Sequence, residues 1–402
     1  MRKIYLACRR FYTKLQDFKV SFRIKTGLYK WAEIKHMSEE GKKICQFQAE
    51  SIERLEMIKT YGFIESGNYT IKYPEIDLWL FRDSTVFHSS DFVITAKGNA
   101  IWPKYFFYNY SKNITRDKFM VKEENGRICY KNPKKVIELD AAFSMIGVFS
   151  HIWAHAIVEY FPKLSMLEAA IKDSKSRITV LIPEYRDPQL KQIMMGQLSK
   201  YDVDVMVISP GEAVHARSLY FIERPTRFTD HEAEITPADQ AIPESVVNVI
   251  KRELVNPLIE NAVTNSKYKK IFLVRRGGIG KGILNGDEIE RYFESLGFIL
   301  LEPHKVSLEE KINIFQSAEF IVGPFGSAFT NLFFCKPGTK VLMFSNYQRL
   351  FENYFSVAQQ YFGVKEMYVT GLDDKKTQNM SHCSFYLPLG KVKDAYNQLL
   401  NE

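Results

Sequence analysis

The chain lacks the cysteine spacing that would indicate a disulfide framework or a zinc site. Its five cysteines are an odd number, lie far apart and form no Cys-x-x-Cys pair. Paired or closely spaced cysteines are the sequence sign of small secreted domains and of structural zinc sites. We therefore expect free thiols in a reducing compartment, the cytoplasm.

Long apolar runs are also missing. No segment approaches the ~20 apolar residues of a membrane span, and Arg9 and Arg10 interrupt the first apolar run before a signal-peptide core can form. We expect a soluble protein. The net charge is +8, and many of the basic residues lie between Arg2 and Lys43. This segment is either a solvated helix face or a peripheral contact with the anionic inner face of the membrane.

Internal repeats, low-complexity tracts and nucleic-acid recognition modules are absent from the sequence as well. Despite the basic charge, we therefore expect no nucleic-acid partner. A non-specific nucleic-acid binder remains the weakest of the functional alternatives.

What the chain contains is an alternation of apolar strands and helices. With 402 residues, 46% of them hydrophobic, it is long enough for two or three domains. We interpret residues 1–75 as a helical basic segment, 76–235 as an N-terminal α/β lobe and 243–402 as a C-terminal α/β lobe. Continuous apolar strands between helices are typical of parallel sheets covered by helices. The predicted fold class is α/β, with two Rossmann-like lobes and a cleft between them.

The periodicity of apolar residues places most elements after residue 150, and short strands are expected between residues 76 and 146. The clearest predicted strands span 178–183, 204–209, 270–276, 298–302, 319–323 and 340–344, and the clearest helices span 152–171, 188–201, 243–261, 286–296, 307–317 and 327–334.

A strand, a turn of small residues and a helix follow one another between Ile321 and Phe334. The turn contains Gly323, Gly326, Ser327 and Ala328, which let a ligand approach the backbone, and the helix that follows directs N–H groups toward it. A phosphate or a sugar diphosphate suits such a site. The alternative is an ordinary strand-to-helix connection of an α/β protein.

A second candidate site ends the apolar strand that begins at residue 270. Arg275 and Arg276 precede a loop with four glycines in six residues, which also contains Lys281. Guanidinium groups beside exposed backbone amides suit phosphate oxygens, although the loop completes neither a Walker nor a dinucleotide fingerprint. Asn285 follows and either caps the next helix or contributes to the site. A flexible loop with surface ion pairs is the alternative.

Titratable side chains are concentrated between Ser150 and Pro162. His151, His155 and Glu159 are spaced by four residues, so one helix face would carry all three and let them hydrogen-bond in sequence. Glu159 is a candidate general base if burial raises its pKa toward neutrality. No third ligand accompanies the two histidines, so we expect no metal. The structural alternative is that the histidines are satisfied at the interlobe surface.

Taken together, these segments resemble glycosyltransferase family 61. The segment from His155 to Pro162 looks like the family's His-x-x-x-Asp-x-x-Pro helix, and 274–276 looks like its Ser-Arg-Arg strand end. The segment 281–288 is similar to Arg-Arg-Ile-x-Asn-Glu-x-Glu, and 323–334 to Gly-x-His-Gly-Ala-x-x-Thr-Asn-Leu-x-Phe. The resemblance covers residues from about 149 to 369.

The resemblance implies a GT-B architecture and inverting transfer without a metal or another cofactor. The C-terminal lobe would hold a nucleotide-sugar donor, a UDP-sugar first and a CMP-sugar as the alternative. The N-terminal lobe would hold a glycan or lipid-linked glycan acceptor of capsule or lipopolysaccharide, with Glu159 as base, His155 orienting it and His151 on the acceptor side. The implied donor contacts are Arg275, Arg276, Lys281, Asn285, Gly323, Phe325, Gly326, Ser327, Ala328 and Asn331.

Several positions depart from the family pattern. Phe325 stands where the family has a histidine, and Met343 stands where it has a carboxylate. Phe325 could stack on a base or a sugar face in place of the lost imidazole contact. The departures motivate two alternatives: a different nucleotide, or a non-catalytic scaffold of the same fold that has lost donor binding.

Overall fold

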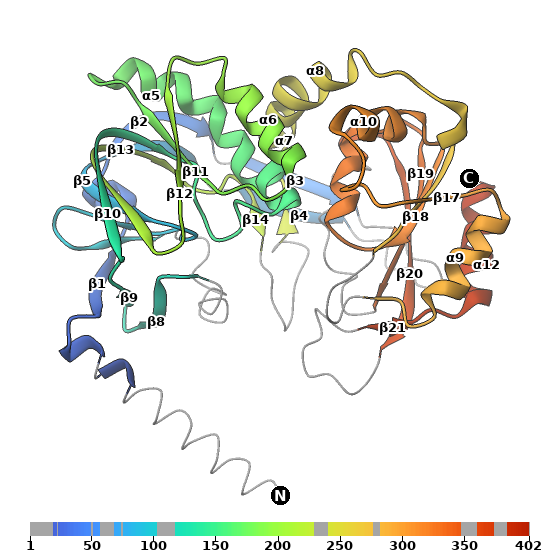
Figure 1. Ribbon diagram of the computed structural model, residues 1–402, viewed down its shortest axis with the longest axis horizontal. Coiled ribbons are helices and arrows are strands. Elements are labelled where there is room, and N and C mark those ends of the chain that lie inside the picture. Colours follow the sequence, from blue (N-terminus) through green and yellow to red (C-terminus); the bar gives the residue numbers. More distant parts are fainter. Residues whose placement is uncertain are drawn as a thin grey trace, which may run out of the picture.

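The structure is a computed structural model that describes residues 19–21, 23–49, 51–56, 68–73, 75–102, 117–228, 240–275, 282–346, 360–373 and 384–401. Two main sheets, one of eleven strands and one of six, organise this part of the chain (Figure 1). Helices accompany both sheets, so the predicted α/β class is confirmed. No helix in the described part of the chain is long and apolar enough to cross a membrane.

The first sheet combines a parallel half with a mixed, largely antiparallel half. Its order is β12-β11-β10-β13-β5-β6-β7-β1-β9-β8, and β2 also pairs with β5. The parallel half is β10 to β13, and β13 pairs with β5 in the antiparallel sense. The strands are β1 Tyr29–Lys35, β2 Lys42–Gln48, β5 Ile76–Phe87, β6 Val93–Ile94, β7 Ala100–Ile101, β8 Met120–Glu124, β9 Arg127–Lys131, β10 Lys135–Ser144, β11 Thr179–Pro183, β12 Asp204–Ile208 and β13 Glu212–Ile222.

The longer helices of this region cover one face of the first sheet. Val180 of β11 packs in the same buried cluster as α5 (Leu167–Asp173) and α6 (Pro188–Leu198). The next residue, Leu181, faces the other way and packs with residues of β6, β7 and α2 (Met37–Glu40). The parallel sheet predicted from the apolar strands after residue 150 is found in β10 to β13, but helices cover only one of its faces.

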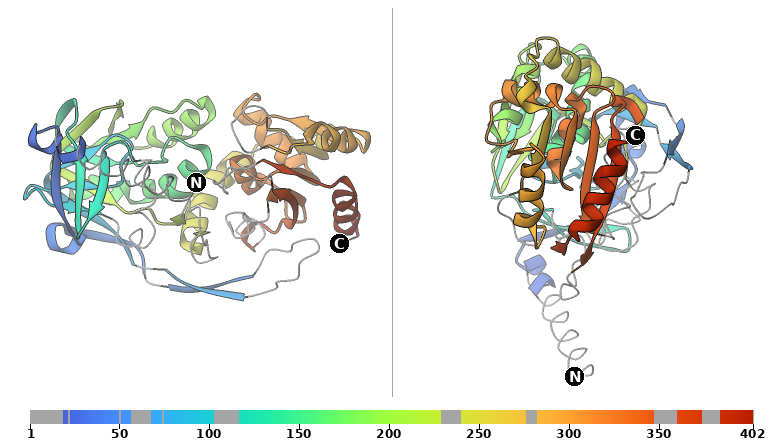
Figure 2. Two further views of the ribbon diagram at one scale, coloured as in Figure 1. Left: turned by 90° about the horizontal axis from the view of Figure 1, so that it is seen from below. Right: turned by 90° about the vertical axis from the view of Figure 1, so that its right-hand side faces the viewer.

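The prediction of a helical segment over residues 1–75 is wrong for most of its described part. Residues 19–21 and 23–25 are helical, but β1 and β2 belong to the first sheet, and β3 (Ser51–Glu56) pairs with β4 (Asn68–Tyr73) in a separate ribbon (Figure 2). Short runs of mixed polarity do not separate helix from strand, and pairing with distant strands decides. Residues 1–18, with much of the predicted basic surface, lie outside the described residues.

The second sheet has the order β17-β16-β18-β19-β20-β21, parallel throughout except for β21. The strands and helices predicted between residues 270 and 344 are all found, within a few residues of their expected bounds, although the last helix is a 3₁₀-helix. The elements are β16 Lys270–Leu273, α9 Gly286–Ser295, β17 Ile299–Leu301, α10 Leu308–Ser317, β18 Phe320–Pro324, η7 Ser327–Phe334, β19 Lys340–Asn346, β20 Lys365–Asp373, β21 Phe385–Tyr386 and α12 Leu389–Leu400.

Helices cover both faces of the second sheet. Phe272 packs with α9 and α12, whereas Ile271 and Leu273 pack with α10 and η7. From β16 the chain passes to β17 on one side and then returns to form β18 on the other. In sheets of this kind, ligands bind beyond the carboxyl ends of the strands where the direction of winding switches. Here that point lies between β16 and β18.

A helical connection joins the two sheets, close to the predicted helix over 243–261. It consists of α7 (Glu244–Ile250), a π-helical turn η5 (Lys251–Val255) and α8 (Asn256–Ile259). Its apolar residues share one buried cluster with residues of both sheets. The two lobes therefore pack on each other through a common core.

Candidate functional site

The helical segment that begins at Trp153 changes its winding twice. It starts as α4 (Trp153–His155), widens into the π-helical turn η2 (Ala156–Tyr160) and tightens into the 3₁₀-helix η3 (Phe161–Met166). Pro162 has no N–H for the carbonyl of Val158, and its ring crowds that carbonyl, so a regular α-helix cannot pass through it. Single π-turns of this kind are frequent at functional sites. This one contains Glu159.

Glu159 is fully buried, and both of its carboxylate oxygens are engaged. Oε1 accepts a hydrogen bond from Nδ1 of His155 at 2.7 Å, and Oε2 accepts one from Nη1 of Arg224 at 2.7 Å. Burial alone would raise the pKa of Glu159, but the Arg224 guanidinium and His155 outweigh it and hold the pKa below its ordinary value. The raised pKa that was predicted for a general base is therefore contradicted.

Arg224 connects Glu159 to a second buried carboxylate, Asp91. Its Nη2 lies 3.5 Å from Oδ2 of Asp91, and the Tyr160 hydroxyl donates to Oδ1 of Asp91 at 3.0 Å. Lys163 is 1% exposed, with its ammonium 4.9 Å from the centre of the Tyr160 ring, and burial lowers its pKa to about 8. Arg224 thus pairs with both buried carboxylates, and these contacts brace the turn that carries Glu159.

His155 and His151 occupy different environments. An ionised Glu159 accepts a hydrogen bond from Nδ1 of His155, so that nitrogen carries a proton, and in the neutral form of the ring Nε2 has the lone pair. The ring stacks on Phe149 with centroids 4.6 Å apart. His151 lies exposed in the turn before α4. The prediction that one helix face carries all three residues is therefore wrong for His151 and holds only for His155 and Glu159. The geometry favours His155 as the group that meets a substrate proton and Glu159 as its positioning residue.

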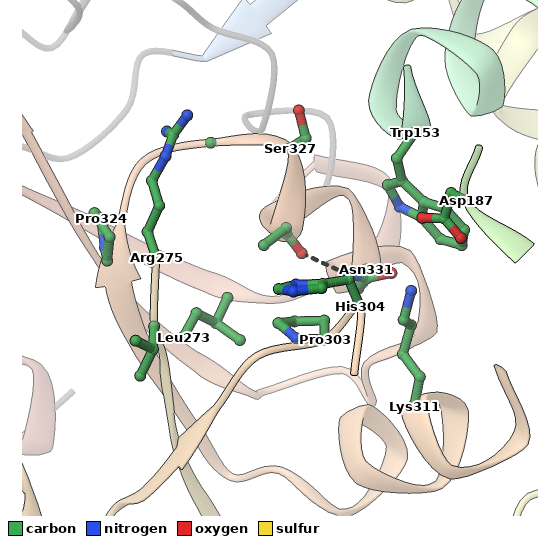
Figure 3. A pocket seen from close by; sticks show the side chains of 13 residues that line it. Trp153, Asp187, Leu273, Arg275, Pro303, His304, Lys311, Pro324, Ser327 and Asn331 are labelled. Atoms are coloured by element: carbon green, nitrogen blue, oxygen red, sulfur yellow. Dashed lines mark hydrogen bonds between the residues drawn. The ribbon is translucent and has the colours of Figure 1, made fainter. Parts of the chain in front are cut away.

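A cavity of about 310 Å³ lies at the carboxyl ends of β16 and β18, against the first lobe (Figure 3). Gly326, Ser327, Ala328 and Asn331, all predicted as donor contacts, line it. Its volume lies at the lower end of the range typical of ligand pockets. The other lining residues are Trp153, Asp187, Leu273, Val274, Arg275, Pro303, His304, Lys311 and Pro324.

Arg275 lies over the turn that begins η7. The residue is exposed, and a Cβ atom added to Gly326 would come within 3.1 Å of its Nη1. The guanidinium thus shares one corner of the cavity with the first N–H groups of η7. An exposed cation and helix-start amides together form a suitable site for an anionic group.

Asn285 lines a second cavity, of about 340 Å³, which also contacts Arg275. Its amide accepts from the Leu387 N–H at 3.0 Å and donates to the Leu387 carbonyl at 2.9 Å and to Oε2 of Glu288 at 2.8 Å. These bonds tie the start of α9 to the chain before α12. The predicted side-chain cap of the helix is not formed.

Three residues singled out from the sequence belong to the core. A Cβ atom on Gly323 would lie 2.7 Å from the carbonyl oxygen of Leu273, so this glycine allows β16 and β18 to approach. Phe325 is buried near Tyr368 and lines neither cavity. Its ring therefore has no face exposed to a cavity on which a base could stack, contrary to the prediction. Met343 is also fully buried. The departures at Phe325 and Met343 therefore alter the core and not the walls of the cavities.

Two predicted donor contacts, Arg276 and Lys281, lie outside the described residues and stay predictions. Within the described ranges, no group of three or more His, Cys, Asp or Glu residues is placed to hold a metal ion.

The buried end of the first cavity was not expected from the sequence. Lys311 of α10 is 2% exposed, and its Nζ lies 3.8 Å from the centre of the Trp153 ring. Burial lowers the pKa of Lys311 to about 8, against the opposing effect of Asp187. The sequence did indicate that Lys311 is buried, because it shares a helical face with the apolar residues Leu308 and Ile312.

Trp153 and His155 lie on the same helical segment but face different sides of it. Residues two apart on a helix point about 200° apart. Trp153 lines the first cavity, whereas His155 lines neither. A residue that lines the cavity and His155 therefore lie two positions apart on the same helical segment.

The region that contains these features also matches a known family. Residues 153–342 match the protein family described as Glycosyltransferase 61. The match begins at Trp153 and ends within β19, and it includes Glu159, Arg275 and the lining residues of the first cavity. A search of the curated proteins finds no match.

Proposed function

Because the chain contains a glycosyltransferase family 61 domain over residues 153–342 and is a glycosyltransferase, we propose that it transfers a sugar from a nucleotide-sugar donor to a hydroxyl group of a glycan acceptor. The observation that carries this proposal is the cavity at the switch point of the second sheet, where Arg275 lies over the turn at Gly326.

The phosphate groups of the donor, a diphosphate in a UDP-sugar and a single phosphate in a CMP-sugar, are proposed to bind beneath Arg275, at the first N–H groups of η7. A guanidinium and backbone amides are suited to a diphosphate, and they stabilise the charge that develops as the nucleotide leaves. A UDP-sugar is the first candidate and a CMP-sugar the second. The position of the cavity between two α/β lobes supports a GT-B arrangement.

In the proposed reaction, the acceptor oxygen attacks the anomeric carbon, the bond to the nucleotide breaks, and the hydroxyl proton passes to Nε2 of His155. Because His155 lines neither cavity, this reaction requires the acceptor hydroxyl to lie between the cavity and the His155 ring. Glu159 holds the proton on Nδ1 and stabilises the imidazolium that forms. Direct displacement inverts the anomeric configuration. Arg224 and Asp91 act as positioning residues through Glu159. The roles of Glu159 and His155 are thus reversed relative to the expectation from the sequence.

The acceptor is proposed to be a growing surface glycan, of capsule or lipopolysaccharide, free or linked to lipid. The resemblance to the family and the basic N-terminal sequence support this proposal. Transfer would then take place in the cytoplasm, at the inner face of the membrane, where anionic lipids attract basic segments.

A thermal-shift screen with uridine, cytidine and guanosine nucleotides tests donor binding. A ligand at 100 times its Kd stabilises the protein by ~2.7 kcal/mol. Arg275→Met should lower the affinity for the nucleotide that binds, on the order of 10-fold or more. The control Arg177→Met removes an exposed arginine that pairs with Asp202 and Asp204. If no nucleotide binds and no nucleotide sugar is hydrolysed or consumed, the proposal is wrong.

A further inference from the structure

The end of the first cavity that faces the N-terminal lobe is rich in hydrogen-bond donors. Lys311 is 2% exposed and makes a cation–π contact with Trp153. Among the described residues, no hydrogen bond or salt bridge joins its ammonium group to an acceptor atom. The indole Nε1 of Trp153 is also buried without a hydrogen-bond partner. Two buried donors thus lie together with no acceptor bound to either.

Acceptor groups in the cavity wall do not pair with these two donors. Asp187 is the acidic side chain among the lining residues. Its Oδ1 accepts from the backbone N–H groups of Gln189 at 2.9 Å and Leu190 at 3.2 Å, where it caps α6. No salt bridge joins Asp187 to Lys311 in the described structure, and the effect of burial on the pKa of Lys311 exceeds that of Asp187. The cavity therefore has a positive end that lacks an anion.

We propose that this end of the cavity binds the sugar of the donor and selects a sugar with a carboxylate group, which Lys311 recognises. The inference rests on the proposed function, because it specifies the sugar class for the same site. A carboxylate is an acceptor-only group with two oxygens. It can take hydrogen bonds from the Lys311 ammonium and the Trp153 indole and neutralise the buried cation.

The arrangement of the cavity assigns Lys311 to the sugar and not to the diphosphate. Arg275 and the first turn of η7 form one end, and Lys311 with Trp153 forms the other (Figure 3). Asn331 also lines the cavity, and its buried Oδ1 has no hydrogen-bond partner. A diphosphate at Arg275 leaves the sugar to extend toward Asn331, which can accept from a hydroxyl group, and toward Lys311.

Calorimetric titration of the full chain with UDP, UDP-glucose and UDP-glucuronate tests this inference. The two sugars differ only at C6, which is a hydroxymethyl group in one and a carboxylate in the other. For cytidine nucleotides, CMP-neuraminate and its methyl ester form the equivalent pair. The wild type should bind the acid on the order of 10- to 100-fold more tightly than the neutral analogue, the value of a charged hydrogen bond.

Lys311→Met should abolish this preference and leave the affinity for the nucleotide alone unchanged within about two-fold. The matched control is Lys305→Met, which removes an exposed lysine that pairs with Glu302, and it should keep the preference. Equal affinity of the wild type for acid and neutral sugars would overturn the inference, even if Lys311→Met failed to fold. An equal loss of nucleotide and sugar-acid affinity in Lys311→Met would also overturn it, because Lys311 would then bind the diphosphate. The absence of any nucleotide binding would instead contradict the proposed function.

Discussion

The Glu159 carboxylate and the interlobe cavity differ in how their buried polar groups are satisfied. In the cluster, Glu159 has both oxygens bonded, to His155 and to Arg224. In the cavity, the buried Nε1 of Trp153 and Oδ1 of Asn331 have no partner. Buried polar groups are normally hydrogen-bonded, and an unmet one in a cavity points to a ligand. This difference supports the proposal that the cluster positions a catalytic group and that the cavity binds a substrate.

The two regions should also differ in how they respond to mutation. Removing one partner of a buried ion pair leaves an uncompensated charge, which is strongly destabilising. Removing a group whose hydrogen-bond partner is the ligand should lower the affinity for the ligand and leave folding intact.

Arg224→Met is expected to have the largest effect on stability. It leaves the buried carboxylates of Glu159 and Asp91 without their shared cation, and the free energy of unfolding should fall by about 3–5 kcal/mol. Chemical denaturation measures the change. Arg217→Met is the matched control, since Arg217 lies in the preceding strand, exposed and paired with Asp140, and should change stability by less than ~0.5 kcal/mol. Equal effects of the two variants would contradict the role of the cluster.

Glu159→Gln should reduce sugar transfer by roughly 100- to 10,000-fold. The amide donates to Nδ1 of His155 and moves the ring proton to Nε2, which can then no longer accept the proton of the acceptor. The thermal shift caused by the nucleotide should stay, because Glu159 does not line the cavity. Glu168→Gln, at an exposed pair with Lys172, is the control. Undiminished transfer in Glu159→Gln would rule out its positioning role.

Gly323→Ala and Gly326→Ala separate the structural glycine of the turn from the one in the cavity. The Cβ of Gly323→Ala would lie 2.7 Å from a backbone oxygen, and overpacking of this kind costs about 1–3 kcal/mol of stability. The Cβ of Gly326→Ala would meet the mobile end of Arg275 at 3.1 Å, so we expect normal stability and weaker donor binding. Thermal denaturation with and without nucleotide distinguishes them. Similar unfolding temperatures for the two variants would contradict this assignment.

Glu366→Gln should have a small effect that depends on pH. Glu366 is 3% exposed, neither carboxylate oxygen has a hydrogen-bond partner, and burial raises its pKa well above the ordinary value. The folded state therefore keeps a proton that the unfolded state loses near pH 4.3, and stability falls as the pH rises above that value toward the folded pKa.

The Gln variant cannot lose this proton. Its unfolding temperature should exceed that of the wild type by a few degrees at neutral pH and fall less between pH 5 and 8. Glu294→Gln, at an exposed position of α9, should leave the pH dependence of the wild type unchanged. Parallel pH profiles for Glu366→Gln and the wild type would contradict the raised pKa.

Local sequence signals were sufficient to predict the series of strands and helices from residue 270 to 344 and the position of Arg275 and Gly326 at its strand ends. Apolar periodicity, glycine turns and helix caps are local signals, and parallel strands bring their carboxyl ends to one edge. The same signals failed for β1 and β2, because pairing with strands far along the chain overrode the local pattern.

The environments of the charged residues, in contrast, depend on contacts between distant segments and could not be predicted from the sequence. Arg224 lies 65 residues from Glu159, and no local pattern announces their pairing or its effect on the carboxylate. Lys311 and Trp153 meet across the two lobes, and burial gives the lysine its altered pKa. The physical reason is common to both: the charge state and the role of a side chain depend on its burial and its partners, which distant segments supply.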